Sequence, residues 1–370
     1  LARVFPGRLL HTGASIADTS SDVYTETDAG LALPEWPSLV LTGHRRAVCM
    51  ATFTPDGERV ITASHDHTAR LFEASSGRCE QILEGHEGSV LWAAASPDSR
   101  KVLTASADRT VRLFDAETGA CDRLFEGHTG HVFTAVFSSD GLQVLTASGD
   151  RTARLYSVTT GEYEARFAGH TAAVYMAAFS PDGKKVLTAS HDGTAKLFDA
   201  QTAKCEQTFE GHSAHVYTAA FSPDAAKVLT ASGDKTARIF DAATGVCERT
   251  LGAHGDHVYM ATFSPDGAKV LTACADGSAR LFDLQTGACE KTFEGSSSAV
   301  HTVAFSRDSR RILSASDDRC VRIFDAENGS CQGAFEGHGE HVYAATFSPD
   351  ARQVLTASDD CTAKLFSVAI

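Results

Sequence analysis

Histidine, serine and aspartate recur together along this chain, and these three side chains form the catalytic triad of many hydrolases. Two of the sets are His170, Ser190, Asp192 and His212, Ser232, Asp234. Near-copies of the set return every 42 residues, eight times in all. Eight near-copies inside packed sheets cannot all be catalytic, and no Gly-x-Ser-x-Gly motif presents a nucleophile. Because buried polar groups need hydrogen-bond partners, we interpret the sets as structural and expect no catalytic residue among them.

Histidines spaced three apart raise the possibility of a metal site. The pairs are His128 and His131, His212 and His215, His254 and His257, and His338 and His341. We expect the first member of each pair to point into its sheet and the second to point out, so that a pair does not converge. No carboxylate or thiol in the same phase completes a ligand set. We therefore expect no metal site and no cofactor.

The spacing of these residues belongs to a repeat that fills most of the chain. A Gly-His pair marks it at Gly43-His44, Gly85-His86, Gly127-His128, Gly169-His170, Gly211-His212 and Gly337-His338. An aromatic residue keeps the same period at Phe72, Phe114, Tyr156, Phe198, Phe240, Phe282, Phe324 and Phe366. A fixed period of this length with short apolar runs in each copy indicates a repeat architecture.

Each copy contains four short strands, and the one that begins at Gly169 is representative. Its expected strands are 174–179, 185–190, 194–199 and 205–209. Turn sequences such as Ser180-Pro181-Asp182-Gly183 separate them, so the copy is an antiparallel meander. The first strand is apolar on both faces, whereas the fourth is more polar, as an outer edge requires. Sheets of this kind pack face to face around an axis, which predicts an all-β propeller.

The count of residues predicts how the ring closes. Residues 35–370 amount to eight periods of 42, and the last copy ends before its fourth strand. Leu39, Val40 and Leu41 fall in the missing phase, so we expect them to complete the C-terminal sheet. The prediction is an eight-bladed propeller over residues 35–370, with four antiparallel strands in each blade. Residues 1–34 form an N-terminal extension that we expect to be either disordered or packed on the surface.

The repeated Gly-His pair, the Ser-x-Asp turn and the strand that ends in aromatic-Asp resemble the WD-repeat family. The resemblance covers about nine-tenths of the chain. It implies that the histidine, the turn aspartate and the serine of each copy are hydrogen-bonded together. The family's strand-ending tryptophan is absent from every copy, and a residue such as Phe198 has no N–H to join the set.

The resemblance also implies that side chains near the start of each first strand surround the mouth of one face. These positions vary between copies, so we expect them to bind protein partners. The residues are His131, Phe133, Tyr175, His215, Tyr217, His257, Tyr259, His301, His341 and Tyr343. Aromatic side chains with a polar tip are typical anchors of binding surfaces. The alternative is that the rings only stack on one another and fill the channel.

Composition narrows the kinds of partner. The formal net charge of −14 disfavours nucleic acid and anionic membrane as partners. Six of the ten cysteines recur at one phase, too far apart to form disulfides, which predicts a reducing, cytoplasmic location. We expect a non-catalytic scaffold for other proteins, either a monomer or part of a larger complex. The alternatives are a sensor or substrate-recognition domain of a larger signalling or ubiquitin-ligase protein and, less favoured, an enzyme that uses the central channel.

Overall fold

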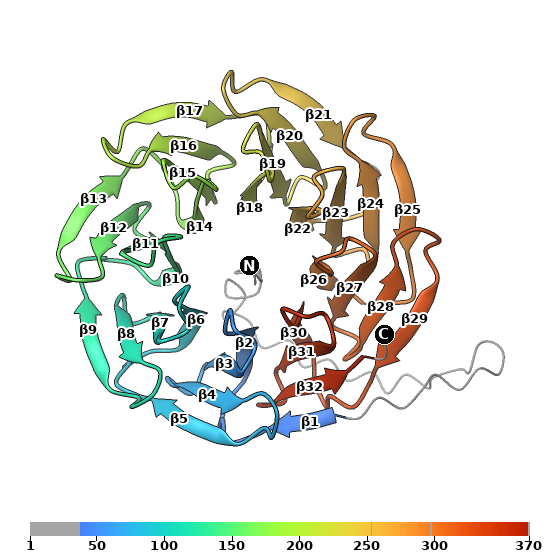
Figure 1. Ribbon diagram of the computed structural model, residues 1–370. Helices are drawn as coiled ribbons and strands as arrows, with labels where there is room; N and C mark the ends of the chain where they lie inside the picture. Colours follow the sequence, from blue (N-terminus) through green and yellow to red (C-terminus); the bar gives the residue numbers. More distant parts are fainter. Residues whose placement is uncertain (1–37, 253, 297, 369–370) are drawn as a thin grey trace, which may run out of the picture.

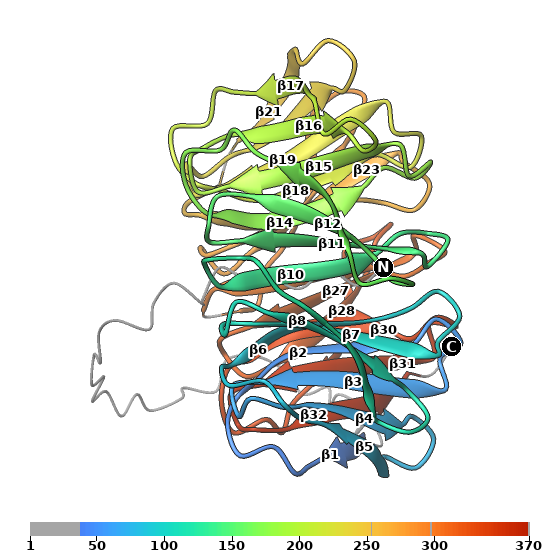
Figure 2. The same cartoon turned by 90° about the vertical axis from the view of Figure 1, so that its left-hand side faces the viewer.

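The chain forms a ring of eight four-stranded sheets. The computed structural model describes residues 38–252, 254–296 and 298–368, where all regular secondary structure is β-strand. Figure 1 looks down the axis of the ring, and Figure 2 shows the sheets stacked around it from the side. In the described part of the chain, no helix is long and apolar enough to cross a membrane. The expectation for residues 1–34 lies outside the described residues.

Seven blades take their four strands from consecutive chain, and each has the strand order of a meander. Blade 1 consists of β2 (Val48–Phe53), β3 (Arg59–Ser64), β4 (Ala69–Glu73) and β5 (Cys79–Leu83). Blade 2 consists of β6 (Val90–Ala95), β7 (Lys101–Ser106), β8 (Val111–Asp115) and β9 (Cys121–Phe125). Blade 3 consists of β10 (Val132–Phe137), β11 (Gln143–Ser148), β12 (Ala153–Ser157) and β13 (Tyr163–Phe167). Blade 4 consists of β14 (Val174–Phe179), β15 (Lys185–Ser190), β16 (Ala195–Asp199) and β17 (Cys205–Phe209).

The second half of the ring repeats this arrangement. Blade 5 consists of β18 (Val216–Phe221), β19 (Lys227–Ser232), β20 (Ala237–Asp241) and β21 (Cys247–Leu251). Blade 6 consists of β22 (Val258–Phe263), β23 (Lys269–Cys274), β24 (Ala279–Asp283) and β25 (Cys289–Phe293). Blade 7 consists of β26 (Val300–Phe305), β27 (Arg311–Ser316), β28 (Val321–Asp325) and β29 (Cys331–Phe335). Blade 8 consists of β30 (Val342–Phe347), β31 (Gln353–Ser358), β32 (Ala363–Ser367) and β1 (Ser38–Leu41).

The eighth blade joins the start of the described chain to its end. Strand β1 pairs antiparallel with β32, and Leu41 lies opposite Ala363 in the register. Leu41 is buried in the apolar cluster that also holds Val48 of blade 1 and Leu365 of blade 8. The predicted eight-bladed ring, closed by the segment around Leu39–Leu41, is therefore confirmed.

Apolar contacts between blades hold the ring together. The cluster of blades 3 and 4 contains Leu155 and Phe167 from one sheet and Val174 and Phe198 from the next. Phe167 and Phe198 meet edge to face, with 5.5 Å between ring centroids. Phe198 stands where the WD-repeat pattern has tryptophan, so its role here is packing against the preceding blade rather than hydrogen bonding.

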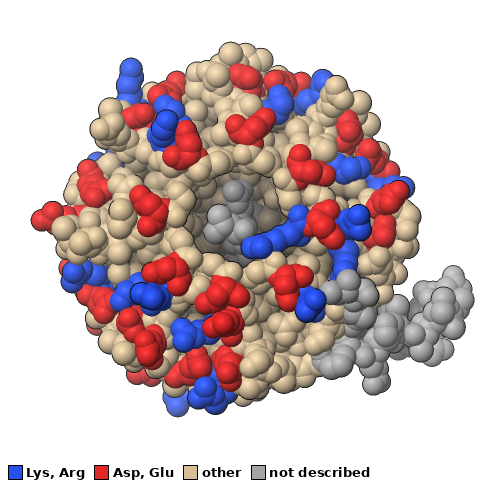
Figure 3. Space-filling model, in the orientation of Figure 1, with Lys and Arg blue, Asp and Glu red and all other residues tan. Residues whose placement is uncertain are grey.

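The face on which the first strands end carries a ring of carboxylates. The first strands end on the face seen in Figure 3, where carboxylates surround the central opening. Each first turn contributes one exposed aspartate, and these are Asp56, Asp98, Asp140, Asp182, Asp224, Asp266, Asp308 and Asp350. Each carboxylate accepts hydrogen bonds within its own turn, as Asp182 does from the hydroxyl of Ser180 at 2.6 Å. The first strands begin on the opposite face, which is the mouth.

Candidate binding surface at the mouth of the propeller

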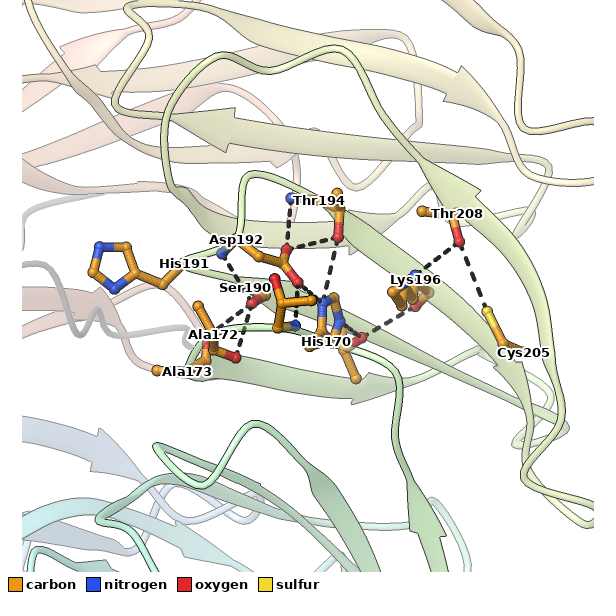
Figure 4. Close-up of polar contacts among 12 residues, drawn as sticks. His170, Ala172, Ala173, Ser190, His191, Asp192, Thr194, Lys196, Cys205 and Thr208 are labelled. Carbon is orange, nitrogen blue, oxygen red and sulfur yellow. Dashed lines mark hydrogen bonds and ion pairs between the residues drawn. The ribbon is translucent and has the colours of Figure 1, made fainter.

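The repeated His-Asp sets are buried inside the blades and fix the turns that border the mouth. In blade 4, His170 Nδ1 lies 2.8 Å from Asp192 Oδ2, and Nε2 lies 2.7 Å from Thr188 Oγ1 (Figure 4). The hydroxyl of Thr194 donates to the other carboxylate oxygen of Asp192 at 2.7 Å. In blade 5, His212 makes the same contacts with Asp234 and Thr230, each at 2.7 Å. These imidazoles face other groups of their own blade, and not the channel.

In blades 4 and 5 the serine of the set bonds backbone groups and not the imidazole or the carboxylate. The Ser190 hydroxyl donates to the carbonyl of Ala173 at 2.9 Å and accepts the N–H of Asp192 at 3.1 Å. Ser232 likewise accepts the N–H of Asp234 at 3.1 Å. The group that contacts the imidazole is the threonine two residues earlier, which the sequence analysis missed. Its signal was present, because Thr188 and Thr230 occupy one phase of the repeat.

Burial and hydrogen bonding set the charge states of these groups. Burial lowers the pKa of His128 in blade 3, which favours the neutral imidazole. Burial would raise the pKa of its partner Asp150, but hydrogen bonds from His128 and Thr152 outweigh this effect and hold the pKa well below 3.8. The pair therefore consists of a neutral imidazole that donates a hydrogen bond to a carboxylate. This contact stabilises the turn, and both groups are largely shielded from solvent.

Blades 6 and 7 replace part of this set with an arginine. In blade 6, Asp276 Oδ2 accepts a hydrogen bond from Arg280 at 2.9 Å. The ring of His254 keeps the contact with threonine, here Thr272 at 2.9 Å, but not the contact with the aspartate that His170 makes in blade 4. Blade 7 has Ser296 in place of the histidine, and Arg322 lies 2.8 Å from Asp318. In both blades the arginine thus gives the turn aspartate a cationic partner in place of the imidazole contact that the other blades have.

Aromatic rings from the first strands line the channel and support the mouth. Phe133, Tyr175, Tyr217 and His301 are buried, and Tyr175 has no exposed surface. Tyr259 and Tyr343 are half-buried. Centroid distances between successive rings are 5.4 Å for Phe133–Tyr175, 6.5 Å for Tyr175–Tyr217, 5.7 Å for Tyr217–Tyr259, 5.2 Å for Tyr259–His301 and 6.4 Å for His301–Tyr343. Much of this set is therefore a packed support, as the alternative interpretation expected.

The histidines two positions before these rings reach the surface. His131, His215 and His257 are exposed, and His341 is half-buried. Three of them join neighbouring blades through a contact between Nδ1 and a backbone carbonyl of the preceding blade. The pairs are His131 with Ala107 at 2.6 Å, His215 with His191 at 2.8 Å and His341 with Asp317 at 2.7 Å. We call this contact the His latch. His257 differs, since its Nδ1 lies 3.3 Å from the hydroxyl of Tyr217.

A carboxylate lies among the mouth residues of blades 7 and 8. Asp317 Oδ1 is 2.9 Å from His301 Nε2 and 3.3 Å from His341 Nδ1. Only 13% of its side-chain surface is exposed. The three residues come from two blades and lie up to 40 positions apart in the chain, which is why the sequence analysis did not bring them together. Over the residues that the structure describes, no group of three or more His, Cys, Asp or Glu is arranged to hold a metal ion.

Comparisons with known protein families agree with this architecture. Residues 93–369 match the family model described as nucleolar protein 10-like, N-terminal domain, which is a β-propeller. Residues 36–73 match the model of the WD domain, G-beta repeat. The chain belongs to the nucleolar protein 10-like family of WD-repeat propellers. Proteins of this kind generally mediate protein–protein interactions and are generally non-catalytic scaffolds.

A solved structure resembles this WD-repeat propeller along most of its length. It is the crystal structure of the computationally designed Ika8 protein, with a TM-score of 0.80 and 24% sequence identity. The match covers 89% of this chain and 98% of that one, and at this identity it concerns the fold alone. A search of curated proteins finds no match.

Proposed function

We propose that this WD-repeat propeller is a non-catalytic platform that binds a peptide or an exposed loop of partner proteins at its mouth. The observation that carries the proposal is that repeated and non-repeated positions of the blades have different roles in the structure. Residues repeated in the blades form the buried sets and the apolar core, whereas six of the non-repeated side chains of the mouth reach the surface. The reachable residues are His131, His215, His257, Tyr259, His341 and Tyr343.

The support beneath these side chains suits them to binding. The buried rings of Phe133, Tyr175, Tyr217 and His301 hold the backbone below, and the His latch fixes two exposed imidazoles and the half-buried imidazole of His341. A partner that docks here orders few additional side chains, so it loses little conformational entropy. Tyrosine and histidine offer an apolar ring together with a donor or acceptor, which suits the mixed surface of a peptide.

The proposed setting is the cytoplasm, with other proteins as partners. All ten cysteines are free, including exposed Cys121, Cys205 and Cys247 on outer strands. Thiols that remain unpaired on the surface fit a reducing compartment. The net charge of −14 favours protein partners over nucleic acid or anionic membrane. The propeller would act either alone or within a larger complex.

Removing two reachable side chains of the mouth should abolish most of the binding. Peptides selected against the wild-type protein from a random display library should bind the double variant His257→Ala, Tyr259→Ala at least about tenfold more weakly, as loss of an interface anchor does. Fluorescence anisotropy of labelled peptides gives the dissociation constants. The matched control is Val246→Ala, because Val246 is 60% exposed but lies beside the outer strand β21.

Circular dichroism and the melting temperature establish that each variant keeps the wild-type fold. Unchanged affinity of the selected peptides for the folded double variant would contradict the assignment of the mouth as the binding surface.

A further inference from the structure

Blade 3 departs from the other copies at three positions near its outer edge. Tyr156 stands where every other copy has phenylalanine, and Tyr163 stands where six copies have cysteine. Arg166 stands at a position that is uncharged in the other seven copies, where the residues are Val40, Ile82, Leu124, Thr208, Thr250, Thr292 and Ala334. The other copies form the same blade without these three side chains, so the three residues are candidates for function.

The two outer strands of blade 3 bring these side chains together with Arg154. Arg166 of β13, the outermost strand in Figure 1, lies opposite Arg154 of β12 in the register. The Cζ of Arg154 is 5.6 Å from the centroid of the Tyr163 ring, and this ring meets Tyr156 edge to face at 6.0 Å. Tyr163 is 51% exposed, Arg166 is exposed and Arg154 is half-buried. Two guanidinium groups and a phenol ring are therefore neighbours at the rim.

Among the described residues, no carboxylate forms an ion pair with either guanidinium group. In blades 6 and 7 the arginine of the third strand pairs with the turn aspartate. In blade 3 that aspartate is Asp150, and it pairs with His128 instead, at 2.7 Å. On β13, the carboxylate of Glu164 accepts a hydrogen bond from Gln143 at 2.6 Å. Like charges directly opposite each other destabilise a strand pair, so an anion that contacts both guanidinium groups would stabilise this edge of the blade.

We propose that Arg154 and Arg166 bind a phosphate monoester group of a phosphorylated protein partner that docks on the rim of blade 3. The inference is independent of the proposed peptide binding at the mouth. A phosphorylated side chain carries a charge of about −1.5 to −2 at neutral pH, which matches two guanidinium groups better than a single carboxylate does. The exposed ring of Tyr163 offers an apolar contact to the residue beside the phosphate. The net charge of −14 favours a protein over a nucleic acid as the carrier of the phosphate.

Retention of the full chain on beads that carry a degenerate phosphoserine peptide library tests the proposal. Wild-type protein should be retained more strongly than on the unphosphorylated library at the same ionic strength, and inorganic phosphate should compete. Arg166→Thr should reduce the phosphate-dependent retention at least about tenfold, as loss of a charge-assisted contact does. Its melting temperature should not fall, because threonine stands at this position in blades 4, 5 and 6 and the like-charge pair is removed.

Two control variants separate this site from general electrostatics and from the mouth. Arg352→Thr removes the same charge from a side chain of blade 8 that is 69% exposed, and it should leave the retention unchanged. The double variant His257→Ala, Tyr259→Ala should also keep the phosphate-dependent retention. Equal retention on the two libraries, or equal retention of wild type and Arg166→Thr, would overturn the proposal. Thermal stabilisation by inorganic phosphate without any preference for the phosphorylated library would assign the site to a free anion and overturn the docking of a protein partner.

Discussion

Replacing Leu41 with alanine should lower the free energy of unfolding by about 2–5 kcal/mol, the usual cost of truncating a buried leucine. Leu41 is 1% exposed and sits on β1, which supplies the last strand of blade 8. Its side chain lies in the same apolar cluster as Val48 of blade 1 and Leu365 of blade 8. A cavity here weakens the closure of the whole ring, because β1 joins the start of the propeller to its end.

The neighbouring residue provides the control for this prediction. Val40 lies on the same strand but is 47% exposed, so Val40→Ala should change stability by less than about 0.5 kcal/mol. Urea unfolding followed by circular dichroism gives both values. Equal and small effects of the two substitutions would show that β1 contributes little to the folded ring.

Replacing Asp150 with alanine should cost about 3 kcal/mol or more, because it leaves several buried donors without an acceptor. Its carboxylate accepts from His128 Nδ1 at 2.7 Å, from the N–H groups of Thr129 and Thr152 at 3.1 Å, and from the Thr152 hydroxyl at 2.6 Å. These groups border the mouth, so their loss should also loosen the turn between β11 and β12. Equilibrium unfolding in urea at neutral pH measures the cost.

An exposed aspartate of the same blade is the control for Asp150→Ala. Asp140 accepts from the Ser138 hydroxyl at 2.5 Å and from the Leu142 N–H at 2.9 Å, but water can replace it. Asp140→Ala should therefore cost about 1 kcal/mol or less. Because the folded protein holds the Asp150 pKa below 3.8, the wild-type advantage over Asp150→Ala is complete above that pH and should shrink as the pH falls below it. Equal costs for both substitutions would contradict the structural role of the buried set.

The architecture could be predicted from the sequence because the repeat is nearly exact. The phase of Leu39–Leu41 predicted the pairing of β1 with β32, since the last copy ends one strand short. Runs such as Val174–Phe179 predicted inner strands covered on both sides, and β14 is largely buried. The first prediction depends on the phase of the repeat and the second on the burial pattern within one copy, and a single sequence displays both directly.

The details of the mouth depended on contacts between copies, which the sequence displays less directly. The latch from His215 to the His191 carbonyl joins positions 24 apart on different blades. The environment of Asp317 likewise combines His301 of its own blade with His341 of the next. The role of Thr188 was missed for another reason: the resemblance to the WD-repeat family directed attention to Ser190.

Hydrogen exchange with and without a bound peptide tests the assignment of the mouth most directly. For a peptide selected against the wild-type protein, protection should appear at the starts of the first strands, in segments around residues 131–133, 215–217 and 257–259. Protection confined to the first turns, around residues 180–183 and their equivalents, or to the outer strands would place the binding surface elsewhere and contradict the account.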